Sequence, residues 1–444
     1  MDHILDALSE QDCFFITTTL QQASSGPPYY RDLLAGVDPN ISSREDLARI
    51  PLLTREIVER EGRRMLSPDA VPWTIASTSG TTTGRQLFTY RGHSESAARR
   101  LIVEACFDGG DLHPLVLHLV NSGHGYDPDA AQAGVFQVPL ERAFHVQTIR
   151  ELLTDDFSFN GYTKRIEVLA GPLRLLKALT LSLMESGVDT SEFALRCIVS
   201  SSDHLTTRWR RLFTDFWGCE LGNTYGLSEV PGLCASECGT CGMFHFSPTA
   251  ITEILHPDKN QPARSYVGRL VATSLHALAP TQPMIRYDTG DLLACHGRCE
   301  KNNALSFELL GRKRQCLLGG ISEGFDEPEI LLASIALNDI LDGVPDIATS
   351  EYSFASLIGV RTSFGLQKWE FSQRRIAGKL AAILALEMRW SPRQYPRQAL
   401  AFCEKLRDAI FNESPALSAT VRDGTVTFEI VLHEPGTTSY WALV

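Results

Sequence analysis

The chain has 444 residues, the hydrophobic and charged fractions of an ordinary globular protein, and a formal net charge of −12. This length is too great for one compact core and predicts two or three domains. The negative charge argues against nucleic acid and against an anionic membrane as the main partner, because both bind cationic surfaces.

The sequence also lacks the signals of a membrane or secreted protein. No stretch approaches the roughly 18 consecutive apolar residues that a membrane span needs. The N-terminus, Met1 to Asp6, lacks the basic and apolar regions of a signal peptide. We therefore expect a cytoplasmic protein whose 11 cysteines are thiols or metal ligands rather than disulfides.

The first three-quarters of the chain read as mixed helix and strand. Residues 1–75 are predicted to form helices and turns. An apolar run over 114–120 is typical of a buried strand, residues 174–187 have helical spacing, and residues 195–199 form another apolar run. Strand, helix and strand in alternation predict a parallel α/β layer.

The sequence changes character after residue 311. A glycine-rich segment, 319–324, predicts a flexible joint. Beyond it the pattern predicts helices near 372–388 and 395–411, followed by a hairpin whose turn is Asp423-Gly424. We therefore expect a small α+β domain at this end of the chain.

The first of four informative segments is a loop of hydroxyls and glycines, Ser77 to Arg85. Small residues let backbone N–H groups approach phosphate oxygens, and the hydroxyls add donors. The glycine spacing is too short for a P-loop, and taken alone the segment is equally typical of a surface linker. The residues predicted to contact phosphate are Ser79, Gly80, Thr81, Thr82, Thr83, Gly84 and Arg85.

Three later segments supply the other groups that a nucleotide site needs. Tyr225 offers a flat face for a base, and Glu229 offers an oxygen ligand for Mg²⁺. Asp291, after a tight Thr-Gly turn, can accept hydrogen bonds from two ribose hydroxyls. Arg312 adds a cation. Each segment alone is common in proteins, but the four in this order predict an ATP site.

These segments together resemble the adenylate-forming superfamily, which contains acyl-CoA synthetases, peptide-synthetase adenylation domains and luciferases. The resemblance is closest to the phenylacetate–CoA ligase and coenzyme F390 synthetase branch. It covers about residues 25–330 and includes segments 29–33, 47–55, 199–206 and 283–287.

The resemblance implies a fold and a reaction. The fold is a large N-terminal adenylate-forming domain with α/β layers, residues 1–311, which binds ATP and the acyl group, and a small mobile α+β domain, residues 312–444. In the reaction, a carboxylate attacks the α-phosphate of ATP to give acyl-AMP and pyrophosphate, and a nucleophile then displaces AMP. The family rotates its C-terminal domain between these steps.

The resemblance also assigns roles to individual residues. The implied catalytic residues are Thr82, Thr83, Arg85, Glu229 and Arg312, with Mg²⁺ held by Glu229. The implied nucleotide-binding residues are Ser79, Gly80, Thr81, Gly84, Ser202, Asp203, Asn223, Tyr225, Gly226 and Asp291.

The chain departs from the family pattern at several positions. Asp203 replaces the more usual glutamate, and Arg314 and Gln315 stand at the hinge. The family places a lysine near the C-terminus that bridges the carboxylate and the α-phosphate, but no lysine follows Lys405 in this sequence. Losing one such contact costs about 10²–10³ in rate. Adenylation is therefore slow, completed by another cation such as Arg85, or absent.

Two short groups of cysteine and histidine predict a structural Zn²⁺ site with tetrahedral coordination. The favoured ligands, which the same branch places similarly, are Cys238, His245, Cys295 and Cys299, with Cys241 and Cys234 as substitutes. Scattered buried thiols are the alternative, and redox chemistry at Cys238-x-x-Cys241 is a minor one.

We therefore predict an ATP-dependent ligase that forms an acyl- or aryl-adenylate from a small carboxylic acid. CoA or a carrier-protein thiol is the expected acceptor, and a homodimer is one expected state. One alternative is a ligase that forms amide or N–N bonds without CoA; another is a degenerate nucleotide-binding partner protein. Candidate acyl-pocket segments are 118–124 and 135–137, and neither identifies the acid.

Overall fold

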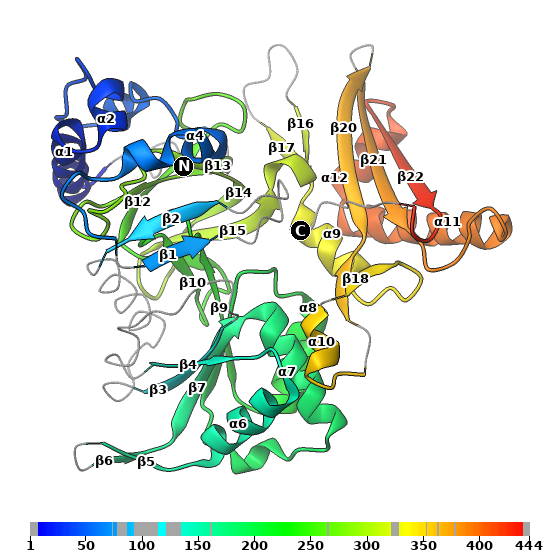
Figure 1. The fold of residues 1–444 in the computed structure, drawn as a ribbon. Helices are drawn as coiled ribbons and strands as arrows, with labels where there is room; N and C mark the ends of the chain where they lie inside the picture. The colour runs from blue at the N-terminus through cyan, green and yellow to red at the C-terminus, as the bar shows by residue number, and fades with distance from the viewer. Residues whose placement is uncertain are drawn as a thin grey trace.

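The computed structural model describes residues 8–72, 74–77, 87–92, 114–120, 135–159, 162–263, 266–320, 328–351, 353–361, 364–376 and 379–437. Figure 1 shows a large N-terminal body, coloured blue to green, beside a smaller C-terminal body in orange and red. Among the described residues, no helix combines the length and the apolar character that crossing a bilayer requires.

Short helices open the described chain, as the sequence predicts for this region. They are α1 (Glu10–Ser25), α2 (Pro28–Leu33), α3 (Arg44–Ala48), α4 (Arg55–Glu61) and the 3-10 turn η1 (Gly62–Met65). A capping box begins α1: the Ser9 hydroxyl accepts from the Asp12 N–H at 3.0 Å, and the Asp12 carboxylate accepts from the Ser9 N–H at 3.1 Å. The Tyr30 hydroxyl donates to the Pro283 carbonyl at 2.7 Å, which fastens this layer to the loop before β14.

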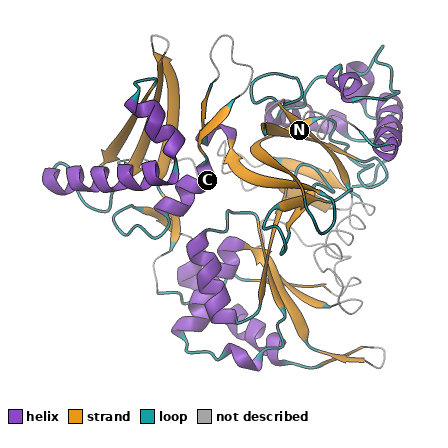
Figure 2. Cartoon of the chain, turned by 180° about the vertical axis from the view of Figure 1, so that it is seen from behind, coloured by secondary structure: helices purple, strands orange, loops and turns teal. Residues whose placement is uncertain are grey.

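One sheet of eleven strands forms the centre of the large body (Figure 2), in the order β12-β13-β14-β15-β11-β10-β9-β8-β7-β3-β4. Its strands are β3 (Leu115–Val120), β4 (Val135–Pro139), β7 (Ile166–Pro172), β8 (Cys197–Ser201), β9 (Glu220–Gly226), β10 (Cys234–Glu237), β11 (Phe244–Phe246), β12 (Ala250–Leu255), β13 (Val267–Ser274), β14 (Tyr287–Arg298) and β15 (Leu305–Arg312). Two short antiparallel pairs flank it, β1 (Thr74–Ser77) with β2 (Phe88–Arg91) and β5 (Phe157–Phe159) with β6 (Tyr162–Lys164).

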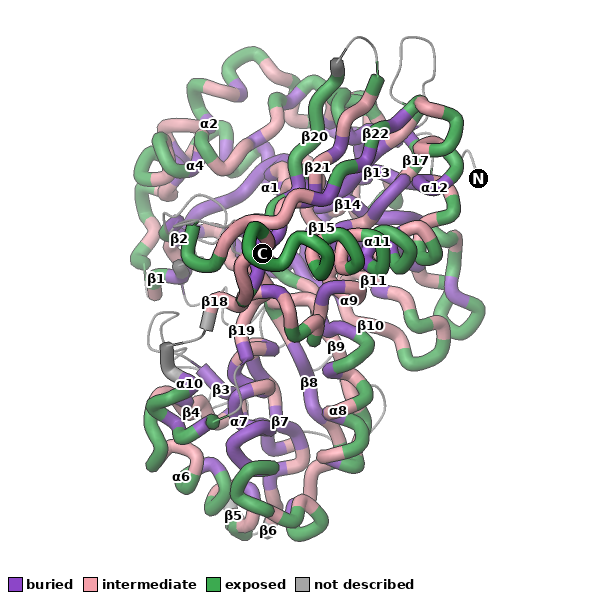
Figure 3. Tube along the Cα trace, turned by 90° about the vertical axis from the view of Figure 1, so that its right-hand side faces the viewer, coloured by how far each residue is buried: buried purple, intermediate pink, exposed green. Residues whose placement is uncertain are grey.

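Five of the eleven strands pair in parallel and carry helices, which confirms the predicted α/β layer. Strands β4, β3, β7, β8 and β9 pair in parallel. Helices α6 (Ala143–Thr154), α7 (Leu173–Glu185) and α8 (Thr207–Trp217) pack against them around a leucine-rich core. Figure 3 shows β7 and β8 as buried along most of their length, as parallel strands covered by helices require. The predicted elements at 114–120, 174–187 and 195–199 are β3, α7 and β8.

Strand β9 is where the sheet changes type. It pairs in parallel with β8 and antiparallel with β10. In α/β sheets, ligands bind beyond the carboxyl ends of strands at the point where the connectivity changes. The carboxyl end of β9 carries Tyr225 and Gly226, so these residues lie where a ligand is expected to bind.

The C-terminal body has its own hydrophobic core, built around Trp369 and Leu384. Its elements are β16 (Leu317–Gly319), β17 (Glu329–Leu332), α9 (Ser334–Leu341), β18 (Thr349–Glu351), α10 (Ser353–Leu357), β19 (Gly365–Gln367), β20 (Trp369–Ile376), β21 (Lys379–Glu387), α11 (Pro396–Glu413), α12 (Pro415–Arg422) and β22 (Val426–His433), with a 3-10 turn, η5 (Lys313–Gln315), before them. The predicted helix near 395–411 is confirmed as α11.

Two other predictions for this body are wrong. The segment 372–388 forms the antiparallel strands β20 and β21 rather than a helix. In β21 the side chains of Ala382, Leu384 and Leu386 are buried in alternation, which is the two-residue period of a strand. The residues between them, Ile383 and Ala385, are also apolar, so the sequence is apolar on both faces of the strand and its two-residue period is hidden.

The predicted hairpin at Asp423-Gly424 is also replaced by a different connection. Ser414 begins helix α12 by accepting from the Leu417 N–H at 3.1 Å, and Gly424, with a φ of +79°, follows its end. Strand β22 then pairs in parallel with β21. The Asp-Gly pair therefore ends a helix here instead of reversing a strand.

The C-terminal body contacts the large body through carboxylates at the end of α9. Asp339 accepts from the Thr207 N–H at 2.7 Å and lies 3.2 Å from His204 Nε2. Asp342 accepts from the hydroxyl of Thr206, the residue that caps α8. Two carboxylates thus lie at the N-terminus of α8, where the helix dipole and the exposed N–H groups favour negative charge.

A second contact is apolar. The segment that follows α10 inserts Ile358, Val360 and Phe364 into the core formed by α7 and α8, where their exposures are 2%, 9% and 7%. The Arg361 N–H donates to the Glu185 carboxylate at 2.9 Å. The predicted domain boundary at residues 311 and 312 stays a prediction, and side chains on both sides of it share one core.

Arg286 ties the N-terminal layer to the sheet. Its side chain is fully buried and makes a bidentate pair with Glu253, with both N···O distances at 2.9 Å. It also donates to the Ile50 carbonyl oxygen and to Asn260 Oδ1. Its backbone φ is +53°, an uncommon conformation for a residue other than glycine, so the surrounding contacts hold the backbone in place.

We predict that Glu253→Gln destabilises the large body by about 3–5 kcal/mol, because it leaves the Arg286 charge buried without its counter-ion. The matched control is Asp32→Asn, which removes an exposed pair with Arg64 and costs about 1 kcal/mol or less. Urea denaturation of the two variants beside the parent measures the difference. Equal losses in both variants would show that Arg286 is not a special constraint.

Candidate functional site

The second, third and fourth sequence motifs meet around one carboxylate, that of Asp291. The Tyr225 hydroxyl donates to Asp291 Oδ2 at 2.7 Å, and Arg312 Nε lies 3.3 Å from Oδ1. Tyr225 lies on β9, whereas Asp291 and Arg312 face each other on the paired strands β14 and β15. The sheet order therefore assembles residues that are up to 87 positions apart in the sequence.

Local backbone geometry holds Asp291 in this position. The Thr-Gly pair predicts a tight turn, but Gly290, at a φ of +74°, lies within β14, where the register with β13 shifts between Arg269 and Val271. The Asp291 N–H donates to the Thr289 hydroxyl at 3.1 Å, and Arg312 Nη1 donates to the Thr289 carbonyl at 2.7 Å. The Asp291 carboxylate is therefore nearly buried, and its neighbours fix its position.

The Asp291 carboxylate helps to raise the pKa of both side chains that contact it. Burial, and then the Asp291 carboxylate, raises the pKa of the Tyr225 hydroxyl well above its usual value, so it stays protonated and can donate. The same carboxylate raises the pKa of Arg312. Asp291 is therefore held as an acceptor between two permanent donors.

Glu229 lies just beyond β9, with only 8% of its surface exposed. Arg55 Nη1 lies 3.7 Å from Glu229 Oε1, and the Tyr287 hydroxyl lies 3.5 Å from the same oxygen. Burial, and then the Glu229 charge, raises the pKa of Tyr287. A nearly buried carboxylate with one cation beside it is a group that a divalent metal ion can use.

The candidate adenine-binding turn follows β8. Parallel pairing of β8 with β9 aligns Ser201 with Thr224, so the turn at Ser202 and Asp203 begins beside the Tyr225 segment. Ser202 adopts a φ of +79° in this turn. Asn223 lies one position earlier on β9, opposite Ser200, and Gly226 pairs with the first residue of β10.

The predicted phosphate loop lies outside the described residues. It comprises Ser79, Gly80, Thr81, Thr82, Thr83, Gly84 and Arg85. The strands on either side of it, β1 and β2, pair with each other. From β2, Thr89 Oγ1 and Arg91 Nη2 both donate to the carbonyl oxygen of Ser228, at 3.2 and 3.0 Å. The second strand is thus fixed to the residue immediately before Glu229.

A cluster of thiols and one imidazole lies at the other end of β10 and β14. The atoms of Cys238, Cys241, His245 and Cys299 that could bind a metal lie within 4.8 Å of one another. The turn between β10 and β11 brings three of them together, since the Cys238 N–H donates to the Met243 carbonyl at 2.8 Å.

One thiol of this cluster, that of Cys238, is predisposed to bind a metal ion. His245 Nδ1 lies 2.8 Å from the Leu305 carbonyl, which directs Nε2 toward Cys241 at 3.3 Å. Burial raises the pKa of Cys238, but hydrogen bonds from the Cys241 and Thr240 backbone outweigh it and bring this pKa to about 6. A thiol that is ionised at neutral pH can bind metal without an energetic penalty for losing its proton.

The structure corrects one member of the predicted ligand set. Cys295 is not in the cluster, because it lies opposite Phe307 in the paired strands β14 and β15 and its side chain joins the apolar core. Cys234 is likewise buried in β10, opposite Gly226. Cys241, named only as a substitute, completes the group. The Cys-x-x-Cys spacing of residues 238 and 241, which the sequence analysis considered only for redox chemistry, is the signal that could have placed Cys241 in the ligand set.

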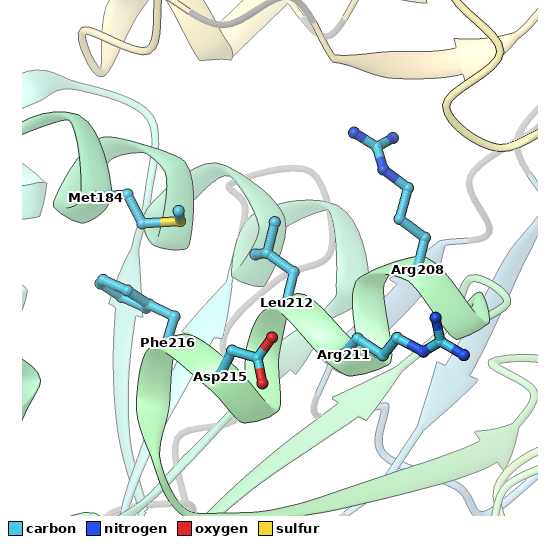
Figure 4. A pocket seen from close by; sticks show the side chains of 6 residues that line it. All are labelled: Met184, Arg208, Arg211, Leu212, Asp215 and Phe216. Carbon is cyan, nitrogen blue, oxygen red and sulfur yellow. The ribbon is translucent and has the colours of Figure 1, made fainter.

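An open groove on the surface lies away from these residues. Met184 of α7 and Leu212 and Phe216 of α8 form its apolar part, and Arg208 and Arg211 its charged part, with Asp215 also lining it (Figure 4). No residue predicted to bind nucleotide or metal lines this groove.

Comparisons with known proteins agree with the motifs. No family model matches the chain. A phenylacetate–coenzyme A ligase of Thermus thermophilus is 27% identical over 314 residues, which is 66% of this chain and 67% of that protein. A phenylacetate–coenzyme A ligase of Pseudomonas putida is 25% identical over 311 residues, 65% of this chain and 66% of that protein.

Solved structures share the fold over almost the full chain. An open conformation of 2-hydroxyisobutyryl-CoA ligase, in complex with its acyl-AMP and CoA, superposes with a TM-score of 0.65 at 14% identity. The match covers 98% of this chain and 91% of that one. The same ligase in its postadenylation state gives a TM-score of 0.62. The chain therefore has the adenylate-forming fold and is similar to the phenylacetate–coenzyme A ligase branch of that superfamily.

Proposed function

We propose that the protein is an AMP-forming ligase that activates a carboxylic acid with ATP and transfers the acyl group to a nucleophile. The observation that carries this proposal is that Tyr225 and Arg312 both contact the carboxylate of Asp291, with Glu229 nearby. In the first step a carboxylate oxygen attacks the α-phosphorus and the bond to the β-phosphate breaks. In the second, the nucleophile attacks the acyl carbon and AMP leaves.

The chain's own residues do mainly positioning work in such a reaction. Asp291 accepts the ribose hydroxyls, and its contacts with Tyr225 and Arg312 hold its carboxylate in position. The adenine lies against the turn at Ser202 and Asp203 and the strand from Asn223 to Gly226. Arg312 is the last residue of β15, and the proposed hinge begins immediately after it.

Two sets of residues are proposed to face the phosphates. They are Glu229 and the loop that the sequence analysis identified. Glu229 fits Mg²⁺ because it is a carboxylate with little exposure. When bound, Mg²⁺ neutralises charge on the phosphates as pyrophosphate leaves. Thr81, Thr82, Thr83 and Arg85 are the proposed donors of the phosphate loop.

CoA is the acceptor that we favour, because the similar proteins named above are CoA ligases. An amine acceptor, giving an amide or N–N bond without CoA, is the second candidate. A degenerate nucleotide-binding protein is disfavoured. A decayed site would not keep Tyr225, Asp291 and Arg312 in mutual contact.

The thiol cluster is a proposed structural Zn²⁺ site. Three cysteines and one histidine at short mutual distances fit the tetrahedral coordination of zinc. Four protein ligands leave no position for a substrate, so the ion would stabilise the ends of β10, β11 and β14. A carrier-protein acceptor, a homodimer and a cytoplasmic location stay predictions.

We predict that Asp291→Asn lowers kcat/KM for pyrophosphate release by about 10²-fold or more, because an amide offers one acceptor where the carboxylate offers two. The assay supplies ATP and Mg²⁺ with a panel of aromatic, aliphatic and amino acids, first without CoA and then with it. Glu308→Gln, an exposed change on β15, is the control and should leave the rate unaltered. Absence of pyrophosphate release from the unmodified protein with every acid would contradict the ligase proposal.

We predict that the purified protein holds about one Zn²⁺ per chain, measured by elemental analysis. Cys241→Ser should lose the metal and Cys295→Ser should keep it, because only the first thiol belongs to the cluster. Chelation should lower the Tm by at least about 3 °C. Metal retained by Cys241→Ser and lost by Cys295→Ser would reverse the ligand assignment made here.

A further inference from the structure

Arg55 is a partly buried cation beside the proposed magnesium ligand, and no sequence motif assigns it a role. It is the first residue of α4, and its side chain is 15% exposed. Its Nε lies 2.9 Å from Glu59 Oε1, one helical turn further on, and its Nη1 lies 3.7 Å from Glu229 Oε1. One guanidinium therefore faces two carboxylates from different parts of the fold.

The backbone that carries Arg55 is fixed to the site strand. The Leu53 N–H donates to the Arg286 carbonyl at 2.9 Å, and the Asp288 N–H donates to the Leu53 carbonyl at 2.8 Å. This bridge pairs Leu53 with Tyr287, whose hydroxyl also faces Glu229. Arg55 thus reaches the site from a segment that is locked to the beginning of β14.

Helix stability does not explain an arginine at this position. The first turn of a helix carries partial positive charge, so a cation there is unfavourable, whereas Glu56 in the same turn is favourable. The position of Arg55 is instead accounted for by Glu59 and Glu229. Its charge is directed toward the site rather than along the helix.

We propose that Arg55 binds the β- and γ-phosphates of ATP, a role that rests on the ligase function proposed above. A Mg²⁺ ion on Glu229 would neutralise that carboxylate and repel the nearby guanidinium. Glu59 keeps hold of Arg55, while the phosphates brought by the nucleotide offer oxygens that a guanidinium fork matches. Glu229 and Glu59 hold the cation ready, and the triphosphate replaces Glu229 as its partner.

The competing explanation is a purely structural ion pair between α4 and the Glu229 turn. The two explanations differ in which ligand they affect. A contact to the β- and γ-phosphates changes the binding of ATP and pyrophosphate and leaves AMP binding unchanged. A structural pair changes the stability of the protein and affects ATP and AMP alike.

Calorimetric titration with ATP, pyrophosphate and AMP, each with Mg²⁺, separates these cases without any acid substrate. We expect Arg55→Gln to weaken ATP and pyrophosphate binding roughly 10- to 100-fold and AMP binding less than about threefold. Arg55→Lys keeps the charge but loses the fork, so it should recover only part of the ATP affinity. The matched control is Arg60→Gln on the same helix, where the arginine is 67% exposed and pairs with Glu61.

The outcomes are distinct. Equal ATP affinity in Arg55→Gln and the unmodified protein, or equal losses for ATP and AMP, would overturn the proposal for Arg55. Failure of the unmodified protein to bind ATP at all would instead count against the ligase function. A thermal melt of each variant without ligand shows whether a loss of affinity merely follows a loss of folding.

Discussion

The buried pair of Arg286 and Glu253 is the constraint on which the site depends. Burying a guanidinium and a carboxylate is costly unless each finds full hydrogen bonding, and here Ile50 and Asn260 complete it. The contact to Ile50 fixes the chain just before α4, and the uncommon backbone conformation of Arg286 sets the direction in which β14 begins. Arg55 and Asp291, which lie on different segments of the chain, therefore both depend on the position of one residue.

The change of pairing at β9 explains why the candidate nucleotide-binding residues lie close together. On its parallel side the strand adjoins β8, whose carboxyl end opens into the Ser202 turn. On its antiparallel side it leads through β10 and β11 to β15 and β14, which bring Arg312 and Asp291 back toward Tyr225. A wholly parallel sheet could not return two consecutive strands to the same edge with such short connections. The mixed sheet is thus a requirement of the site.

The sequence identified the residues that meet around Asp291 better than it predicted the fold of the C-terminal body, and the reason is physical. Asp291, Tyr225 and Arg312 stand in motifs whose chemistry limits which residues can serve, so their order along the chain carries information. In strand β21 no chemical role limits the residue types, and apolar residues on both of its faces obscure the two-residue period of a strand. Cys295 was misplaced because spacing alone cannot show which face of β14 a side chain occupies. The position of Arg55 depends on the pairing of Leu53 with Tyr287, a contact across more than 200 residues that no local pattern reveals.

The contacts between the two bodies bear on how the protein would complete a two-step reaction. The resemblance implies a rotation of the C-terminal body about the segment after Arg312. In the present arrangement Asp339 and Asp342 cap α8, and Ile358 and Phe364 are buried in the core of the large body. Rotation would remove these contacts from the N-terminus of α8 and expose the apolar side chains, unless the segment that carries Ile358 and Val360 stays in place while the chain bends near β18 and β19. The polar contact is readily exchanged for water, whereas the apolar contact is not. Rotation of the C-terminal body therefore costs least free energy if the inserted segment stays in place and only the contacts of Asp339 and Asp342 with α8 break.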